Sequence, residues 1–272
     1  MNSSTMKHNL PATCNSTAIL PGAPWLIAHK SMLTVNKPYK FTLNHQDYVI
    51  WKNNKGEVSA LNNICPHMQA PLSDGWICEE RNTIACPFHA LEFNSEGKLY
   101  QEGKLQSKAI TNSLKLIVEN DLIWTYDHHQ PLLPIPNLIS RITEGYQFLG
   151  IAGEKTIQAP FLQCLKINYD FNHAIATHRQ PFNFDCIVVK NYQENGFYTT
   201  LDQEVTRTNH NWQELIKNPA LITQPQTLHN HFEYSFPSTT SLITQTNFGE
   251  IAQFFMLYPE TERSTKTFIL LY

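Results

Sequence analysis

Short runs of β-branched and aromatic residues, separated by polar turn sequences, recur along residues 25–126. One run occupies residues 48–51, a polar stretch with a glycine follows at 53–56, and a second run lies at 58–61. Two strand-forming runs on either side of such a turn are typical of a β-hairpin. Residues 93–99 repeat the strand–turn–strand pattern. The pattern therefore predicts a small antiparallel β-domain in the first half of the chain.

The rest of the chain divides into a linker and a second domain. Three prolines interrupt residues 127–137, which predicts a linker or an irregular crossover. Strand-like runs return in residues 138–272, together with one helical pattern at about 168–178. Residues 1–24 are polar with scattered proline and glycine, which predicts an N-terminal arm. We therefore expect an α+β fold with two domains, at 25–126 and 138–272.

Composition and charge exclude several classes of protein. The 272 residues are 42% apolar and 16% charged, unlike those of a disordered chain. A formal net charge of −3 favours neither nucleic acid nor an anionic membrane as a partner. The sequence has no apolar run of the roughly 18 to 20 residues that span a bilayer, and its first residues lack the apolar core of a signal peptide. A cytoplasmic protein is therefore expected.

Two short segments combine cysteine with histidine. In a large cytosolic chain, clustered cysteines indicate metal binding rather than disulfides. Cys65 and His67 form a C-x-H pair, and Cys86 and His89 form a C-x-x-H pair. Such a Cys₂His₂ set could hold a structural Zn²⁺, although zinc fingers usually place the two cysteines together. One thiolate and one imidazole from each loop also suit a [2Fe–2S] centre in which two cysteines hold one iron and two histidines the other.

Both loops continue into a longer pattern of proline, glycine and apolar residues. They resemble the Rieske iron–sulfur motif in the stretches Cys65-Pro66-His67-x₃-Pro71-Leu72-x₂-Gly75 and Cys86-Pro87-Phe88-His89-x₃-Phe93-x₃-Gly97. The resemblance implies that residues 25–126 form a β-rich Rieske [2Fe–2S] domain. It also implies that Cys65 and Cys86 ligate one iron and that His67 and His89 ligate the other.

A second candidate site lies in the helical pattern, where Asp170, His173 and His178 form a D-x₂-H-x₄-H sequence. Asp170 and His173 share a helix face, but five residues on an ideal helix place His173 and His178 roughly 140° apart. Both histidines can face one metal only if the helix is distorted or ends near His178. The sequence resembles the mononuclear-iron motif of Rieske non-haem iron oxygenases. The resemblance implies that both histidines ligate iron and that Asp170 connects His173 to His89 of a neighbouring subunit.

The third iron ligand of that family is missing from this pattern. Family members carry it as an Asp or Glu on a late helix, whereas residues 256–268 here predict a strand, a turn and a strand. The later carboxylates are expected to be ordinary surface residues, namely Asp202, Glu204, Glu250, Glu260 and Glu262. We therefore expect an antiparallel-sheet catalytic domain that is incomplete at its C-terminus, and we expect the apolar residues 268–272 to lack the helix that covers them.

The resemblance implies the terminal oxygenase component of a Rieske system. An NAD(P)H-dependent reductase, directly or through a ferredoxin, would supply electrons, and a mononuclear Fe(II) would activate O₂ to hydroxylate or demethylate an aromatic or otherwise apolar substrate. Such oxygenases form head-to-tail homotrimers. The alternative is a Rieske-type electron-transfer protein without oxygenase activity. Six aromatic residues could line an apolar pocket, namely Phe182, Phe184, Trp212, Phe232, Phe254 and Phe255. For most of them, packing in the core is the simpler interpretation.

Overall fold

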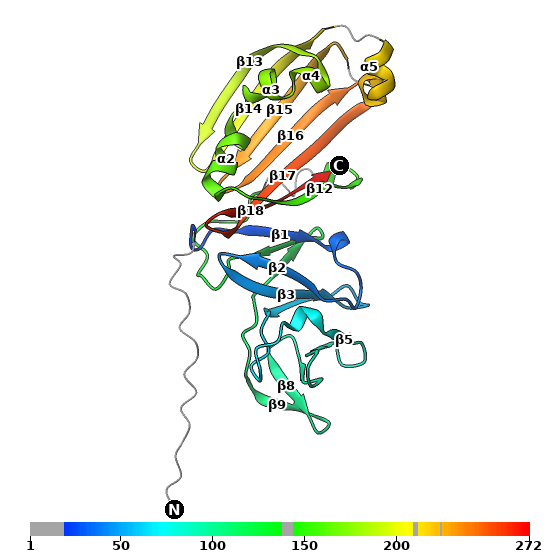
Figure 1. The fold of residues 1–272 in the computed structure, drawn as a ribbon. Helices are drawn as coiled ribbons and strands as arrows, with labels where there is room; N and C mark the ends of the chain where they lie inside the picture. The colour runs from blue at the N-terminus through cyan, green and yellow to red at the C-terminus, as the bar shows by residue number, and fades with distance from the viewer. Residues whose placement is uncertain (1–18, 138–143, 209–211, 224) are drawn as a thin grey trace, which may run out of the picture.

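Four antiparallel β-sheets form the framework of the protein in a computed structural model (Figure 1). Three small sheets occupy the N-terminal half and one seven-stranded sheet the C-terminal half, with few helices. The predicted combination of a β-rich first part with a sheet-dominated second part is confirmed. The structure describes residues 19–137, 144–208, 212–223 and 225–272, so most of the predicted arm and the start of the predicted second domain lie outside the described residues.

The small sheets contain three, three and five strands. The first has the order β1-β11-β10, the second β2-β3-β4, and the third runs from β5 to β9 in sequence order. Their strands are β1 (Trp25–His29), β2 (Tyr39–Leu43), β3 (Gln46–Lys52), β4 (Val58–Asn62), β5 (Trp76–Cys78), β6 (Thr83–Ala85), β7 (Glu92–Phe93), β8 (Lys98–Gln101), β9 (Lys104–Ala109), β10 (Ile117–Glu119) and β11 (Leu122–Thr125).

Both predicted hairpins are confirmed, and in each of them an asparagine side chain accepts backbone hydrogen bonds across the turn. In the β3–β4 turn, the side-chain oxygen of Asn53 accepts hydrogen bonds from the backbone N–H groups of Lys55 (3.0 Å) and Glu57 (2.9 Å). In the β7–β8 turn, the side chain of Asn94 accepts from Lys98 at 2.8 Å. An asparagine that replaces backbone partners in this way favours a tight return of the chain.

The large sheet has the strand order β12-β18-β17-β16-β15-β14-β13, and all its neighbours are antiparallel. Strands that follow each other in sequence are mostly neighbours in space, so local hairpins build most of the sheet. Its strands are β12 (Gly150–Ile157), β13 (Phe184–Asn195), β14 (Tyr198–Arg207), β15 (Thr227–Ser235), β16 (Thr239–Thr246), β17 (Gly249–Thr261) and β18 (Ser264–Leu271).

The helices are short and lie mainly over the large sheet (Figure 1). The predicted single helix at 168–178 is wrong, because two helices separated by a turn occupy this region. Asp170 ends the first of them, and its carboxylate accepts a hydrogen bond from the N–H of Asn172 at 3.1 Å. This bond competes with helix continuation. The helical segments are η1 (Lys30–Met32), η2 (Leu72–Asp74), α2 (Phe161–Tyr169), α3 (His173–Thr177), α4 (Arg179–Phe182), α5 (Trp212–Lys217) and η3 (Pro219–Thr223). None of the described helices is long and apolar enough to span a membrane.

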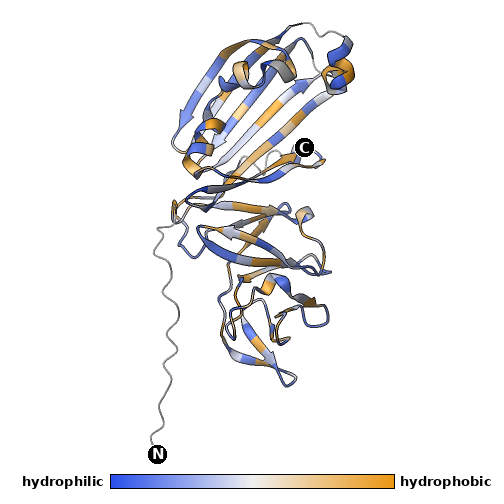
Figure 2. Cartoon of the chain, in the orientation of Figure 1, coloured by the Kyte–Doolittle hydropathy of each residue, from blue (hydrophilic) through white to orange (hydrophobic). Residues whose placement is uncertain are grey.

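One hydrophobic core joins the small first sheet to the large sheet. It contains Trp25 and Trp124 from the N-terminal half and Phe254, Phe268 and Tyr272 from the C-terminal half, each at most 5% exposed. Figure 2 shows apolar residues along the strands where the two halves meet. The expectation that residues 268–272 need a covering helix is therefore wrong, because this shared core buries Phe268 and Tyr272.

A second, smaller core lies within the third sheet and its neighbours. Val49, Trp51 and Phe93 are fully buried there, and the cluster also includes Cys65 and Cys86 at 1% exposure each. The two cysteines thus belong to the packed interior of the N-terminal half, whereas the loops that carry them reach its surface.

Candidate metal centres

Two loops of matching conformation carry the first four candidate ligands. In each loop, the residue four positions after the cysteine, Gln69 or Ala90, has a positive φ of 59° or 54°. Its N–H donates to the cysteine carbonyl, at 2.8 Å for Cys65 and 3.0 Å for Cys86. Each cysteine N–H in turn donates to the carbonyl five positions later, at 2.9 Å in both loops. The two segments therefore hold their cysteines in equivalent settings.

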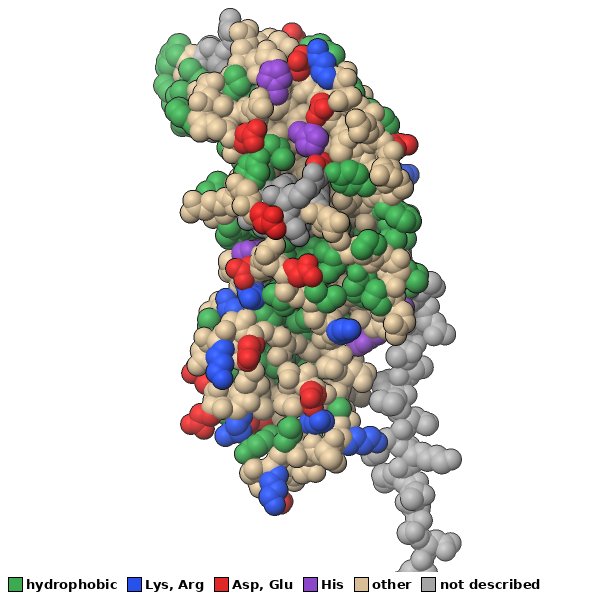
Figure 3. All heavy atoms as spheres, turned by 180° about the vertical axis from the view of Figure 1, so that it is seen from behind, with side chains coloured by type: hydrophobic (Ala, Val, Ile, Leu, Met, Phe, Trp, Pro, Cys, Tyr) green, Lys and Arg blue, Asp and Glu red, His purple; other side chains and the backbone are tan. Residues whose placement is uncertain are grey.

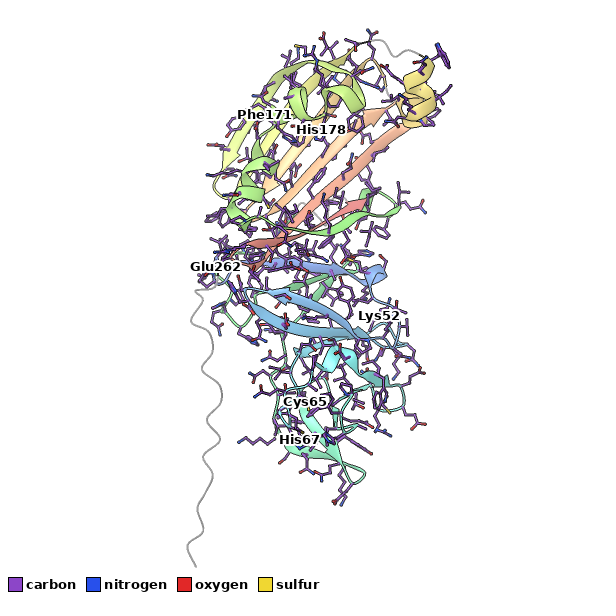
Figure 4. All side chains as sticks on the ribbon, viewed as in Figure 1. Lys52, Cys65, His67, Phe171, His178 and Glu262 are labelled. Atoms are coloured by element: carbon purple, nitrogen blue, oxygen red, sulfur yellow. The ribbon has the colours of Figure 1, made fainter. Side chains whose placement is uncertain are left out.

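The loops bring the four side chains together as two pairs. The thiols of Cys65 and Cys86 lie side by side in the second core. The rings of His67 and His89 are exposed, with centroids 4.8 Å apart and planes inclined by 70°. Figure 4 shows Cys65 and His67 near the end of the N-terminal half. The two cysteines thus lie in the core, and the two histidines lie at the surface of the same region.

The surroundings of Cys65 suit a metal-bound thiolate. Burial raises the pKa of its thiol above the ordinary value, and Cys86 adds to the increase. The backbone N–H groups of His67 and Met68 donate to the sulfur and lower the pKa. Hydrogen bonds to a ligating sulfur stabilise its negative charge, and a metal removes the cost of burying that charge. The donor set therefore fits a metal centre.

A two-metal cluster fits this arrangement better than a single zinc ion. In the part of the chain that the structure describes, no three His, Cys, Asp or Glu side chains gather where one metal ion could be held. A structural zinc site needs about four ligands around one point. Two cysteines and two histidines in separate pairs instead match a cluster in which each iron takes two protein ligands. Cys78 lies apart from both pairs, at the end of β5.

The second candidate site lies at the junction of α2 and α3. The rings of His173 and His178 are close, with centroids 5.2 Å apart and planes inclined by 67°. Because α3 ends at Thr177, His178 is no longer constrained to the position that an ideal helix would give it. Burial lowers the pKa of His178, and the neighbouring His173 lowers it further. A neutral imidazole offers a lone pair to a metal, so the lowered pKa favours the form of His178 that can ligate iron.

Asp170 is exposed beside these histidines, but its carboxylate has a different partner. The Nδ1 atom of His173 contacts the backbone carbonyl of Asp170 in a short hydrogen bond. The Asp170 carboxylate accepts the N–H of Asn172. Asp170 thus orients one candidate iron ligand through its backbone, and the residue itself is exposed.

None of the later carboxylates named from the sequence joins the two histidines. Asp202 bonds to His231 at 2.5 Å, and Glu204 pairs with Lys190 at 2.8 Å. In the view from behind, acidic and histidine side chains lie near one another over the large sheet, in the upper part of Figure 3. The remaining three also lie away from His173, because Glu250 accepts from Tyr146, Glu260 accepts from Thr156, and Glu262 lies in the exposed β17–β18 turn.

An apolar cavity of about 360 Å³ opens beside His173 and His178. Phe171 and His178 mark its place between the helices and the large sheet in Figure 4. Of the six aromatic residues proposed from the sequence, four line this cavity, namely Phe182, Phe184, Phe232 and Phe255. Phe254 belongs to the shared core instead. Sequence reasoning missed the polar lining residues, although two of them, Asn230 and Tyr234, alternate along β15 with the predicted Phe232 and so share its sheet face.

Comparison with known proteins agrees with the first site. Residues 24–114 match the family described as the Rieske [2Fe-2S] domain, and all four candidate cluster ligands lie within this match. The oxygenase component of dicamba O-demethylase from Stenotrophomonas maltophilia is 26% identical over 162 residues, which cover 57% of this chain and 47% of the relative. Aminopyrrolnitrin oxygenase PrnD from Pseudomonas fluorescens is 23% identical over 59% of this chain and 47% of the relative.

Solved structures extend the likeness to the second half of the chain. The crystal structure of dicamba monooxygenase bound to dicamba superposes with a TM-score of 0.75 at 20% identity, covering 94% of this chain and 78% of that one. NdmA of Pseudomonas putida CBB5 with caffeine gives a TM-score of 0.65 at 17% identity, covering 93% and 74%. The matched region is about half the length of the first curated relatives. The protein therefore contains a Rieske [2Fe–2S] domain, has the fold of Rieske oxygenase components and is a homologue of them.

Proposed function

We propose that this chain is the terminal oxygenase component of a Rieske non-haem iron system. The supporting observation is the presence of two different candidate iron centres on one chain. A Rieske domain carries the Cys65 and His67 loop, and the large sheet carries His173 and His178 beside an apolar cavity. An electron carrier alone needs only the first centre.

Cys65 and Cys86 would hold one iron of the cluster, and His67 and His89 the other. When bound, a [2Fe–2S] cluster supplies one-electron transfer. Because the rings of His67 and His89 are exposed, the iron that they would hold would lie near the surface, where a reductase could approach. That partner would be an NAD(P)H-dependent reductase, acting directly or through a ferredoxin.

His173 and His178 would hold the mononuclear iron. When bound between two histidines with open coordination positions, Fe(II) supplies the site for O₂ activation. The cavity beside it would hold an organic substrate while its apolar walls exclude water. Hydroxylation or demethylation of that substrate is the proposed reaction.

The residues of the two candidate centres lie in opposite halves of the folded molecule, as the labels of Cys65, His67 and His178 in Figure 4 show. An electron would therefore pass between copies rather than within one. We infer a head-to-tail homotrimer, because a heterologous contact that closes into a ring joins one end of each subunit to the other end of the next. Asp170 would connect the two centres, since its backbone carbonyl holds Nδ1 of His173 and its exposed carboxylate would accept an N–H group from His89 of the neighbouring subunit.

The test is the iron and acid-labile sulfide content of the anaerobically purified full chain. Both centres together require about three iron and two sulfide per chain. His173→Ala should remove one iron and leave the visible absorbance of the cluster unchanged. His229→Ala, which alters a histidine beside Glu204 on another part of the sheet, is the matched control. Unchanged iron content in His173→Ala would contradict the assignment of this site.

A second candidate function is electron transfer without oxygenase activity. Among the described residues, no carboxylate joins His173 and His178 as a third metal ligand, which favours this alternative. Two iron and two sulfide per chain, with no change in His173→Ala, would identify the protein as such a carrier.

The cluster assignment has its own test. Cys65→Ser should abolish most of the visible absorbance, because a serine hydroxyl does not replace a thiolate ligand at neutral pH. Cys78→Ser should leave the spectrum unchanged, since this cysteine lies outside the ligand pairs. A purified Cys65→Ser protein with the full visible spectrum would refute the assignment.

A further inference from the structure

The floor of the cavity consists of side chains in rows across the large sheet. Residues that pair across neighbouring antiparallel strands project on the same face. One row contains Tyr234 on β15, Thr240 on β16 and Phe255 on β17, because Tyr234 pairs with Thr240 and Thr240 with Phe255. All three line the cavity. The polar groups of this row therefore sit at one defined place among apolar neighbours.

The hydroxyl groups of Tyr234 and Thr240 are buried without a partner. Tyr234 is 7% exposed and Thr240 2%, and neither hydroxyl has a hydrogen-bond partner within the described chain. The side-chain nitrogen of Asn168, at the end of α2, is likewise buried and unpartnered, and Asn168 also lines the cavity. Buried hydroxyl and amide groups almost always have a partner in folded proteins. Three such groups around one cavity indicate that a bound molecule supplies the missing acceptor.

A second row of polar side chains in the same cavity differs from the Tyr234 row, because its members are hydrogen-bonded to one another. Thr244 donates to Asn230 at 3.0 Å, and Asn230 donates to Gln203 at 3.4 Å. These three side chains satisfy one another across β14, β15 and β16. The polar groups of this row therefore need no bound partner, unlike the hydroxyls of Tyr234 and Thr240. The hydroxyl of Ser241, next to Thr240 on β16, is also buried and unpartnered, but Ser241 does not line the cavity.

The character of the lining indicates the charge of the ligand. The described side chains around the cavity are apolar, amide or hydroxyl groups, apart from Asp170 and the two histidines. Away from His173 and His178, where the iron is proposed to bind, a carboxylate or sulfonate would meet no cationic partner and would lose its hydration without compensation. Burial raises the pKa of Tyr234, so its hydroxyl stays protonated and available as a donor.

We propose that the cavity selects a neutral, mainly apolar molecule that presents an oxygen acceptor, such as a ketone or an ether, to the hydroxyls of Tyr234 and Thr240. Its status as the substrate rests on the proposed oxygenase function. The volume of about 360 Å³ is at the small end of the range of ligand cavities, which suits a molecule of one or two rings.

The test compares three probes of similar shape by equilibrium dialysis against the full iron-loaded chain. The probes are 2-acetylnaphthalene, which is neutral with an acceptor, 2-ethylnaphthalene, which lacks the acceptor, and the anion 2-naphthoate. We expect 2-acetylnaphthalene to bind about tenfold more tightly than 2-ethylnaphthalene, and 2-naphthoate to bind most weakly.

Two variants and one matched control locate the selectivity. Tyr234→Phe should weaken binding of 2-acetylnaphthalene about tenfold and leave binding of 2-ethylnaphthalene unchanged. Thr240→Val should act in the same direction and serves if Tyr234→Phe does not fold. Tyr169→Phe is the control, because the Tyr169 hydroxyl bonds to the carbonyl of Pro237 at 3.4 Å and does not line this cavity.

Equal affinity for 2-naphthoate and 2-acetylnaphthalene would overturn the proposal, as would binding of none of the probes. An equal loss for both neutral probes in Tyr234→Phe would also overturn it, since the hydroxyl would then not recognise the acceptor. Binding is measured without turnover, so selective binding with only two iron per chain would contradict the oxygenase function alone. Three iron per chain without selectivity would contradict this inference alone.

Discussion

Gly75 is a position at which a single added methyl group should disturb the cluster-binding loops. It follows η2 and directly precedes β5, whose Trp76 pairs with Ala85 on β6. A Cβ atom built at Gly75 would lie 1.8 Å from the carbonyl oxygen of Ala85 and 3.2 Å from that of Leu72. Ala85 immediately precedes Cys86 in the sequence. Gly75→Ala therefore forces apart two backbone segments beside one of the cluster ligands.

The size of the effect follows from this distance. A carbon and a carbonyl oxygen in contact lie about 3.3 Å or more apart, so one backbone must move by roughly 1.5 Å. No side-chain rotation can relieve the overlap, because the Ala85 carbonyl oxygen is a backbone atom and the added Cβ is bonded directly to the backbone. Overpacking of a well-packed site costs about 1–3 kcal/mol, and a backbone clash belongs at the upper end. A loss of about 3 kcal/mol is a large part of the typical 5–15 kcal/mol that stabilises a domain.

Guanidinium unfolding, followed by the visible absorbance of the cluster and by tryptophan fluorescence, measures the change. We expect Gly75→Ala to lower the unfolding midpoint and the ratio of visible to ultraviolet absorbance. Gly145→Ala is the control, because an added Cβ there meets no atom of the described residues within 4 Å and should change the free energy of unfolding by less than about 0.5 kcal/mol. A Gly75→Ala protein with the midpoint and absorbance ratio of the unaltered chain would refute the reasoning.

Two further predictions concern stability. Phe268→Ala should lower the free energy of unfolding by about 3–5 kcal/mol, because it opens a cavity in the core shared by both halves, whereas Phe248→Ala at 82% exposure should have little effect in the same denaturation assay. Hydrogen bonds to Glu233 and Asp202 raise the pKa of His231 to about 9, against desolvation that lowers it. The stability from this raised pKa is present below pH 6.5 and is lost as the pH rises through about 9. Thermal unfolding of His231→Gln should lack this part of the alkaline decrease, and an identical pH profile would contradict the assignment.

The cluster loops illustrate what could be read from local sequence. In each loop, cysteine and histidine are two or three residues apart, and the positive φ that follows is part of the same short turn. The hairpins at 48–61 and 93–99 are also local, because Asn53 and Asn94 close their turns with bonds to nearby residues. Interactions of this range leave a signal in composition and spacing.

The errors arose where the structure depends on contacts that the hydrophobic pattern does not show, either a local side-chain bond or packing against a distant segment. The helical pattern at 168–178 is interrupted because the Asp170 carboxylate competes for a backbone N–H, an outcome that periodicity does not reveal. The apolar residues at 268–272 appeared to need a cover, but β18 contributes them to a core that includes Trp25, more than 240 residues earlier. The local sequence pattern of a strand does not predict which other segment of the chain its apolar face will pack against.

The sequence by itself determined the residue types and spacing of both candidate centres, since ligand chemistry depends on side chains that lie close together along the chain. Only the tertiary structure decided how these groups combine. It pairs the two loops so that the cysteines are buried and the histidines exposed, and it ends α3 so that His178 meets His173. It also aligns Tyr234 with Thr240 through the register of β15 and β16. The physical reason is that packing between segments far apart in sequence, and not local propensity, sets these distances.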